Sequence, residues 1–209
     1  QNPDYSLPQT SAIIHGKLGL KSNCASFDIS LGCSGFVYAL SILQSFMATN
    51  KMKKGLLFTA DPYSKIINVN DKNTSLLFGD AAAVTVISDN PCFVSEDFTF
   101  GTSGEDYKDL ICENGTLYMN GRGIVNFAMK EIPRDILKLL GKNNLNVSDI
   151  DKYLIHQGSK FIISSLVKKL WLREDQIMYD IYDYGNTVSS SVPILLAKVI
   201  PDTNIKRIL

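Results

Sequence analysis

One cysteine of the sequence stands in a setting suited to covalent catalysis. Cys33 lies in the run Gly32-Cys33-Ser34-Gly35, between the extended stretch 25–29 and an apolar stretch with helical spacing that begins at Phe36. A helix start offers unpaired backbone N–H groups and the positive end of the helix dipole, both of which stabilise a thiolate. The two glycines permit a tight turn and the approach of a substrate. The other three cysteines lack this setting, although most lone cysteines simply pack as small apolar groups.

Two further polar residues follow predicted strands. His156 comes directly after the apolar stretch Tyr153-Leu154-Ile155, and strand ends are where α/β proteins place reactive groups. Asn186 follows Gly185 ahead of another apolar stretch, a position that also suits an ordinary turn or helix cap. None of the three residues is decisive alone, and it is the combination of a thiol, an imidazole and a side-chain amide that points to a site.

The elements around these residues alternate along the chain. Period-2 and continuous apolar runs predict strands, and apolar residues spaced three or four apart predict helices. The expected strands are 25–29, 56–60, 83–87, 153–155 and 177–181; the expected helices are 36–47, 124–140, 161–170 and 192–199. The strand at 56–60 reads as buried on both faces, and residues 91–116 as antiparallel ribbon. Such alternation predicts an α/β fold with mostly parallel strands.

A repeated pattern suggests that the fold has two related halves. Residues 27–34 resemble residues 179–187, because each stretch leads through glycine into a polar residue ahead of an apolar helix. Strand, glycine and helix in succession are common, so coincidence is the alternative. A duplication predicts a first half over residues 1–100 that carries the nucleophile and a second over 101–209 that carries the histidine and asparagine.

The composition excludes several classes of protein. Lys plus Arg and Asp plus Glu number 21 each, so the basic excess typical of nucleic-acid binders is missing. No apolar run is long enough to span a bilayer, and the first ten residues do not resemble a signal peptide. Four scattered cysteines and two histidines match no metal-site spacing. We therefore expect reduced thiols, a cytoplasmic location, and no metal or cofactor.

Five segments in order resemble one family. Residues 25–40 are similar to the nucleophile segment of the β-ketoacyl-acyl-carrier-protein synthase III family almost residue for residue. Residues 71–83, including Phe78-Gly79-Asp80, then Met119-Asn120-Gly121, Ile155-His156-Gln157 and 185–193 continue the match to the end of the chain. The resemblance implies the thiolase fold, a layered α-β-α-β-α arrangement with two pseudo-equivalent halves that is incomplete here. We expect an internal fragment lacking both ends.

The resemblance also implies a reaction. It is the decarboxylative Claisen condensation of an acyl-CoA starter with malonyl-acyl carrier protein through an acyl-cysteine, carried out by a homodimeric acyltransferase in fatty acid biosynthesis. Coenzyme A and the carrier's phosphopantetheine enter as substrates. In this scheme Cys33 is the nucleophile, and His156 and Asn186 each donate an N–H to the enolate.

Eight other positions match substrate-binding positions of the family. Leu7 corresponds to a residue that reaches into the partner's acyl pocket, and Lys72 to a basic residue near the coenzyme A nucleotide. The pocket walls correspond to Phe78, Met119, Gly121 and Ile124. Ordinary packing, or a solvated charge for Lys72, is the alternative interpretation of these positions.

Two departures from the family pattern keep other functions open. The family's His-Gln-Ala-Asn is here His156-Gln157-Gly158-Ser159, and Phe-Gly-Asp-Gly-Ala-Gly is here residues 78–83 with three alanines. Gly158 and Ser159 therefore stand where the family holds the carrier arm or a water. One alternative is a non-decarboxylative acyltransferase to oxygen or nitrogen; the other is a non-catalytic subunit or remnant.

Overall fold

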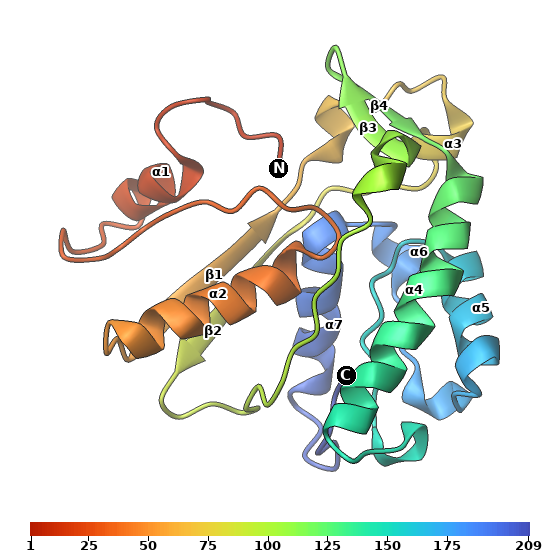
Figure 1. The fold of residues 1–209 in the computed structure, drawn as a ribbon. Coiled ribbons are helices and arrows are strands. Elements are labelled where there is room, and N and C mark those ends of the chain that lie inside the picture. The colour runs from red at the N-terminus through yellow and green to blue at the C-terminus, as the bar shows by residue number, and fades with distance from the viewer.

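The structure, a computed structural model, describes residues 1–209 and combines helices with short strands (Figure 1). The helices are α1 (Thr10–Lys17), α2 (Gly35–Thr49), α3 (Lys72–Ser75), α4 (Gly121–Lys142), α5 (Lys160–Leu170), α6 (Ile181–Tyr184) and α7 (Ser191–Val199). The strands are β1 (Lys54–Ala60), β2 (Ala82–Ser88), β3 (Leu110–Glu113) and β4 (Thr116–Met119). All four long helices predicted from the sequence are present, as are two of the five predicted strands.

The strands pair in the opposite sense from the prediction. β1 and β2 form an antiparallel pair with Leu57 opposite Thr85, and β3 and β4 form an antiparallel hairpin. Parallel neighbours need a crossover connection, usually a helix that returns the chain to the same end. The connection between β1 and β2 contains only the four-residue helix α3 and turns, so the chain doubles back. The antiparallel ribbon expected over residues 91–116 is confirmed only at its end, where the β3–β4 hairpin begins at Leu110; residues 91–109 form no strand.

Two predicted strands in the second half are replaced by single bridges. Tyr153 bridges Ile177 in the parallel sense, and residues 178–180 form no strand before helix α6 begins at Ile181. The cause is Gln157, which is buried: its Nε2 donates to the carbonyls of Ile155 and Met178, and its Oε1 accepts from the N–H of Asp180. The side-chain amide takes backbone groups that a longer ladder would have paired.

One expectation about burial is wrong. Leu56 and Phe58 of β1 are 43% and 38% exposed, together with Val84 and Val86 opposite them on β2. The strand is therefore buried on one face only, because α2 packs on β1 and no residue of 1–209 covers the other face. This face of the sheet is apolar and open.

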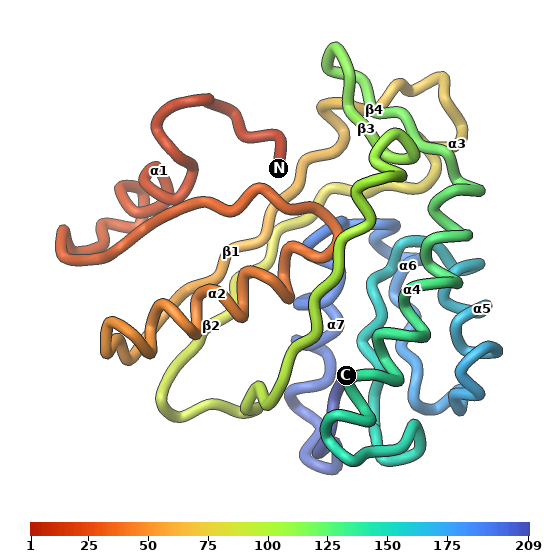
Figure 2. Tube along the Cα trace, viewed as in Figure 1, coloured from red at the N-terminus to blue at the C-terminus, as the bar shows by residue number.

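The largest core cluster lies in the second half of the chain. It gathers nine buried residues between α4, α5 and the segments that follow, including the fully buried Tyr153 and Ile163. The last residues pack beside this unit, since the N–H of Leu154 donates to the carbonyl of Leu209. Helix α1 contributes no buried residue and stands apart from the rest of the molecule (Figure 2). None of the helices combines the length and apolar character needed to cross a membrane.

Candidate active site

Cys33 lies in the turn that leads into α2, as the sequence predicts. Its side chain packs beside a small cluster formed by Tyr63, Leu117 and Val188. The turn has little free space: a Cβ on Gly32 would lie 3.5 Å from Val188 Cγ1, and one on Gly35 would lie 3.3 Å from Ser189 Cβ. The two glycines therefore let the cysteine turn pack closely on the segment that follows Asn186.

Asn186 is held by close contact between two backbone segments. Its N–H donates to the Leu77 carbonyl at 2.8 Å, and its carbonyl accepts from the Gly79 N–H at 3.0 Å. Its side-chain Oδ1 accepts from the Val188 N–H at 3.0 Å, so the amide orientation is fixed. The side chain is 4% exposed and no bond occupies Nδ2. The Asn186 side chain therefore offers a free N–H donor whose oxygen is already committed.

Gly79 makes this approach possible. A Cβ there would lie 2.1 Å from the Tyr184 carbonyl oxygen, a backbone atom that cannot move aside alone. We expect Gly79→Ala to displace the segment carrying Asn186 and to lower the activity of the full-length protein at least tenfold, whereas the thiol of Cys33 stays in place. Ala substitution of Gly16, which has no atom within 4 Å of its Cβ position, is the matched control. Equal activity of both variants would show that the contact is dispensable.

His156 is held by one nitrogen and free at the other. Its Nδ1 lies 2.6 Å from Ser191 Oγ, whereas Nε2 is buried and has no hydrogen-bond partner. Burial lowers the pKa of His156 to about 4, against a smaller opposing effect from the Val188 backbone. The imidazole is therefore neutral at pH 7, which suits a hydrogen-bond donor or acceptor rather than a fixed cation.

The depressed pKa predicts an acid sensitivity. Folding favours the neutral imidazole, so the stabilisation is fully present above the unfolded pKa near 6.5 and is lost as the pH falls through about 4. We expect the free energy of unfolding to drop by up to about 3 kcal/mol over this range. Urea unfolding of wild type and His156→Gln at several pH values measures it. A drop of the same size in the variant would contradict the assignment to His156.

Val188 brings the three predicted residues into one neighbourhood. It belongs to the cluster beside Cys33, its N–H binds Asn186, and its carbonyl lies 3.2 Å from Ser191 Oγ, the atom bonded to His156. Its φ of 54° is left-handed, an uncommon conformation for a β-branched residue. The strained residue thus orients one backbone group toward Asn186 and another toward the imidazole's partner.

The thiol of Cys33 is less acidic than its place at a helix start suggests. Burial raises its pKa to about 11; a backbone hydrogen bond within Cys33 opposes the rise and the charge of Asp61 adds to it. The direction is opposite to the thiolate stabilisation expected from the sequence. Desolvation by the surrounding apolar cluster outweighs the helix dipole, so attack by Cys33 requires removal of its proton during the reaction.

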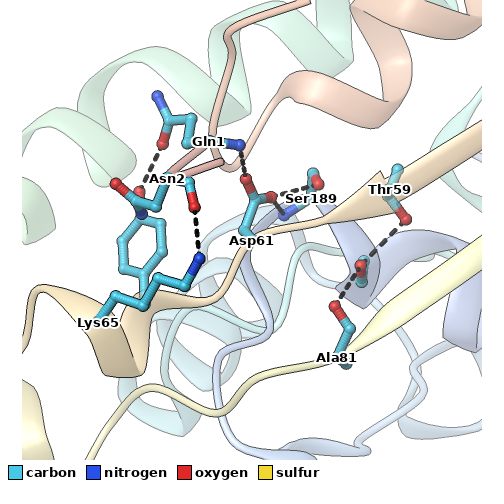
Figure 3. Close-up of polar contacts among 9 residues, drawn as sticks. Gln1, Asn2, Thr59, Asp61, Lys65, Ala81 and Ser189 are labelled. Carbon is cyan, nitrogen blue, oxygen red and sulfur yellow. Dashed lines mark hydrogen bonds and ion pairs between the residues drawn. The ribbon is translucent and has the colours of Figure 1, made fainter. Parts of the chain in front are cut away.

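A network of buried polar groups fixes the Asn186 segment to the end of β1 (Figure 3). Asp61 is 1% exposed and accepts from both the N–H and the hydroxyl of Ser189. The next hydroxyl, Ser190 Oγ, contacts Thr59 Oγ1 at 3.0 Å and the Ala81 carbonyl at 3.3 Å. The turn between Asn186 and α7 is therefore held against both strands.

The structure brings only some of the predicted substrate-binding residues to this neighbourhood. Phe78 packs on Tyr63 with ring centroids 4.9 Å apart and bridges Asn186. Gly158 adjoins the imidazole, since a Cβ there would lie 3.5 Å from His156 Nε2. Ser159 instead caps α5, because its Oγ accepts from the Ile162 N–H at 3.2 Å.

The other predicted positions lie further out. Leu7 is 85% exposed beside α1, and Lys72 is exposed at the first residue of α3. The remaining three stand where the β3–β4 hairpin meets α4: Met119 ends β4, Gly121 begins α4, and Ile124 is half-buried in its first turn. No hydrogen bond or ion pair joins these five to the three central residues.

Sequence reasoning missed the residues that hold the site together. Asp61 directly follows a predicted strand, the same signal that identified His156. Ser189, Ser190 and Ser191 form a run of three hydroxyls directly ahead of an apolar stretch, and all three are buried. A buried hydroxyl needs a partner, so this run was the available signal. No group of three or more His, Cys, Asp or Glu side chains is arranged to hold a metal ion.

Comparison with solved structures identifies the fold. A crystal structure of 3-oxoacyl-(acyl-carrier-protein) synthase III superposes with a TM-score of 0.91 at 30% identity, over 99% of this chain and 69% of that one. The fold is therefore the α/β thiolase-like fold of these synthases. A family model for 3-oxoacyl-[acyl-carrier-protein (ACP)] synthase III matches residues 27–104, and its C-terminal counterpart matches residues 140–208.

Curated relatives agree with this match. Beta-ketoacyl-[acyl-carrier-protein] synthase III of Clostridium perfringens is 34% identical over 222 residues, covering 98% of this chain and 68% of the relative. The enzyme of the same name from Lactococcus lactis subsp. cremoris is 33% identical over 94% of this chain, which spans 65% of the relative's length. The chain belongs to the 3-oxoacyl-[acyl-carrier-protein] synthase III family.

Proposed function

We propose that the protein containing this chain condenses an acyl-CoA starter with malonyl-acyl carrier protein and releases carbon dioxide. The names of the relatives supply the class of product, a 3-oxoacyl thioester on a carrier protein. The observation that carries the proposal is the meeting of a cysteine, a neutral histidine and an asparagine with a free N–H around Val188.

The first half-reaction loads the enzyme. Cys33 Sγ forms a bond to the thioester carbonyl carbon as the bond to the coenzyme A sulfur breaks, and the thiol proton leaves to the released coenzyme A thiolate. Because the pKa of Cys33 is raised to about 11, the thiol loses its proton during the attack on the thioester rather than before it. Backbone N–H groups at the start of α2 are suited to the oxyanion that forms.

The second half-reaction uses the two side chains. The malonyl thioester loses carbon dioxide, and its electrons form an enolate whose oxygen needs hydrogen-bond donors. Asn186 Nδ2 makes no hydrogen bond while its Oδ1 is bound, and the buried His156 Nε2 has no partner; a neutral imidazole provides an N–H without a charge. The enolate carbon then attacks the acyl group on Cys33 and the thiolate leaves, so the free enzyme returns once it regains a proton.

The proposal is tested by supplying the acylated, full-length protein with different acceptors. We expect carbon dioxide and a 3-oxoacyl product with malonyl-acyl carrier protein, and no acyl transfer to simple alcohols or amines. Transfer to those acceptors without carbon dioxide would favour the second candidate, a non-decarboxylative acyltransferase. The departure Gly158-Ser159 from the family's Ala-Asn, directly after Gln157 in the segment that carries His156, favours that candidate. A protein that never becomes acylated would be a non-catalytic subunit.

The proposal includes a division of the chain and a location. Residues 1–100 belong to the half that provides the nucleophile, and residues 101–209 to the half that provides the imidazole and the amide. All four cysteines are unpaired, which supports the reducing conditions of the cytoplasm. Acyl-CoA and the carrier protein act as substrates, and no further cofactor is required.

The proposal also includes a homodimer, which the N-terminal segment supports. Tyr5, Leu7, Leu18 and Leu20 are all exposed around α1, which buries no residue of its own. Apolar side chains gathered on one projecting segment are typical of an interface. We expect light scattering of the full-length protein to give a dimer at micromolar concentration and Leu7→Asp to weaken it at least tenfold. Val94→Asp changes a residue that is also widely exposed and should leave the dimer intact. A monomeric wild type would contradict the dimer.

A further inference from the structure

The contact between Ser191 and His156 bears on which nitrogen of the imidazole carries the proton. Ser191 Oγ lies 2.6 Å from His156 Nδ1, and the serine is 2% exposed. A neutral imidazole carries one N–H, and the group bonded to one ring nitrogen decides which nitrogen holds the proton. Because Nε2 has no partner of its own, Ser191 is the side chain that sets this choice.

The distances distinguish the two possible arrangements. The Ser191 hydroxyl has a single proton and two candidate acceptors, His156 Nδ1 at 2.6 Å and the Val188 carbonyl at 3.2 Å. Contacts donated by a hydroxyl are shorter, about 2.7–2.8 Å when the acceptor is an oxygen, than contacts donated by an N–H to an oxygen, at about 2.9–3.0 Å. A contact this short indicates that the serine donates. Nδ1 then accepts, and the ring proton is on Nε2.

We propose that Ser191 is a positioning residue that donates its hydroxyl proton to His156 Nδ1 and so keeps an N–H on Nε2. That N–H is the donor required by the enolate, and in this respect the inference rests on the proposed function. The tautomer itself depends only on the contacts described. With the opposite tautomer Nε2 would present a lone pair, which repels an enolate oxygen.

The surrounding turn holds Ser191 in place independently of the histidine. Ser189 is bound to Asp61, and Ser190 to Thr59 and Ala81, so the turn is attached to both strands (Figure 3). The Gln157 N–H approaches Ser191 Oγ at 3.4 Å and occupies a lone pair of that oxygen. The hydroxyl oxygen is therefore fixed in position, and its proton can reach the imidazole, the nearer of its two acceptors.

Nitrogen NMR of the imidazole rings in the full-length protein tests the inference directly. The His156 signals are those missing from a His156→Gln variant. We expect the wild type at pH 7.5 to show a protonated Nε2 and a bare Nδ1. Ser191→Ala should shift the population toward Nδ1–H, because the Val188 backbone then remains as the acceptor near Nδ1. Ser191→Cys, of similar size and with a weaker donor, should be intermediate.

A matched control and a second readout complete the test. Ser190→Ala removes the neighbouring buried hydroxyl, which does not contact the imidazole, and should keep the wild-type tautomer. Decarboxylation of malonyl thioester by Ser191→Ala should fall about tenfold or more, within the ~100- to 1000-fold cost of losing a whole donor. The inference would be overturned if His156 carried its proton on Nδ1 in the wild type, or if it kept the proton on Nε2 in Ser191→Ala. If the wild type does not decarboxylate the malonyl thioester, the proposed function is refuted. The NMR result would still decide which tautomer His156 adopts.

Discussion

Replacing Cys33 by alanine should abolish covalent acylation by acyl-CoA completely. The substitution removes the only sulfur that packs in the cluster with Val188, next to the segment that carries Asn186. It leaves both proposed enolate donors in place, so slow release of carbon dioxide from the malonyl thioester, without condensation, should persist. Intact-mass measurement after incubation with acyl-CoA follows the first effect, and carbon dioxide release follows the second.

The three exposed cysteines provide the control for this experiment. Cys112 lies on the β3–β4 hairpin and is exposed, so Cys112→Ala should be acylated as the wild type is. A Cys33→Ala protein that still gains one acyl group would move the nucleophile elsewhere. Loss of decarboxylation together with acylation would show that Cys33 also shapes the enolate site.

Replacing Asn186 by alanine should separate the two half-reactions. Acylation of Cys33 should continue, whereas decarboxylation and condensation should fall by on the order of 100- to 1000-fold, the usual cost of losing one preorganised donor. The physical reason is that Nδ2 is free to donate while Oδ1 is bound to the Val188 N–H. Rates of the two half-reactions are measured separately, by mass and by carbon dioxide release.

An aspartate at the same position distinguishes a donor from a cap. Asn186→Asp keeps an oxygen for the Val188 N–H but cannot donate a hydrogen bond when ionised. We expect it to be as poor as Asn186→Ala in decarboxylation. Recovery of the wild-type rate in Asn186→Asp would mean that Asn186 only caps the turn. A His156→Ala protein that loses acylation but decarboxylates normally would make the imidazole the thiol's base instead.

Local patterns of the sequence predicted the helices well and the strand pairing poorly. Helices α2, α4, α5 and α7 appear because apolar residues recur at helical spacing over nine or more residues. The sense of pairing between β1 and β2 depends on how the connection after Asp61 turns, which periodicity does not encode. The loss of the strand after Ile177 has a similarly non-local cause, the buried amide of Gln157.

In the candidate site, too, local sequence predicted some features, and contacts between distant residues determined the others. Cys33, His156 and Asn186 stand out by residue type and by position after a strand or before a helix. The groups that orient them, Asp61 and Ser191, act through contacts across 128 and 35 positions of the chain, respectively. The sequence predicted a lowered pKa for Cys33, whereas burial raises it. The burial depends on residues such as Tyr63 and Leu117, which are distant in sequence.

The central claim is that this site works through an acyl group on one particular sulfur, and peptide mapping of the acylated protein tests it most directly. Full-length protein is incubated with a panel of acyl-CoA thioesters, digested at low pH to preserve the thioester, and analysed by mass spectrometry. We predict one acyl group, carried by the peptide that contains Cys33, and its disappearance when malonyl-acyl carrier protein is added. An acyl group on Cys24, Cys92 or Cys112, or one on Cys33 that malonyl-acyl carrier protein leaves untouched, would contradict the account.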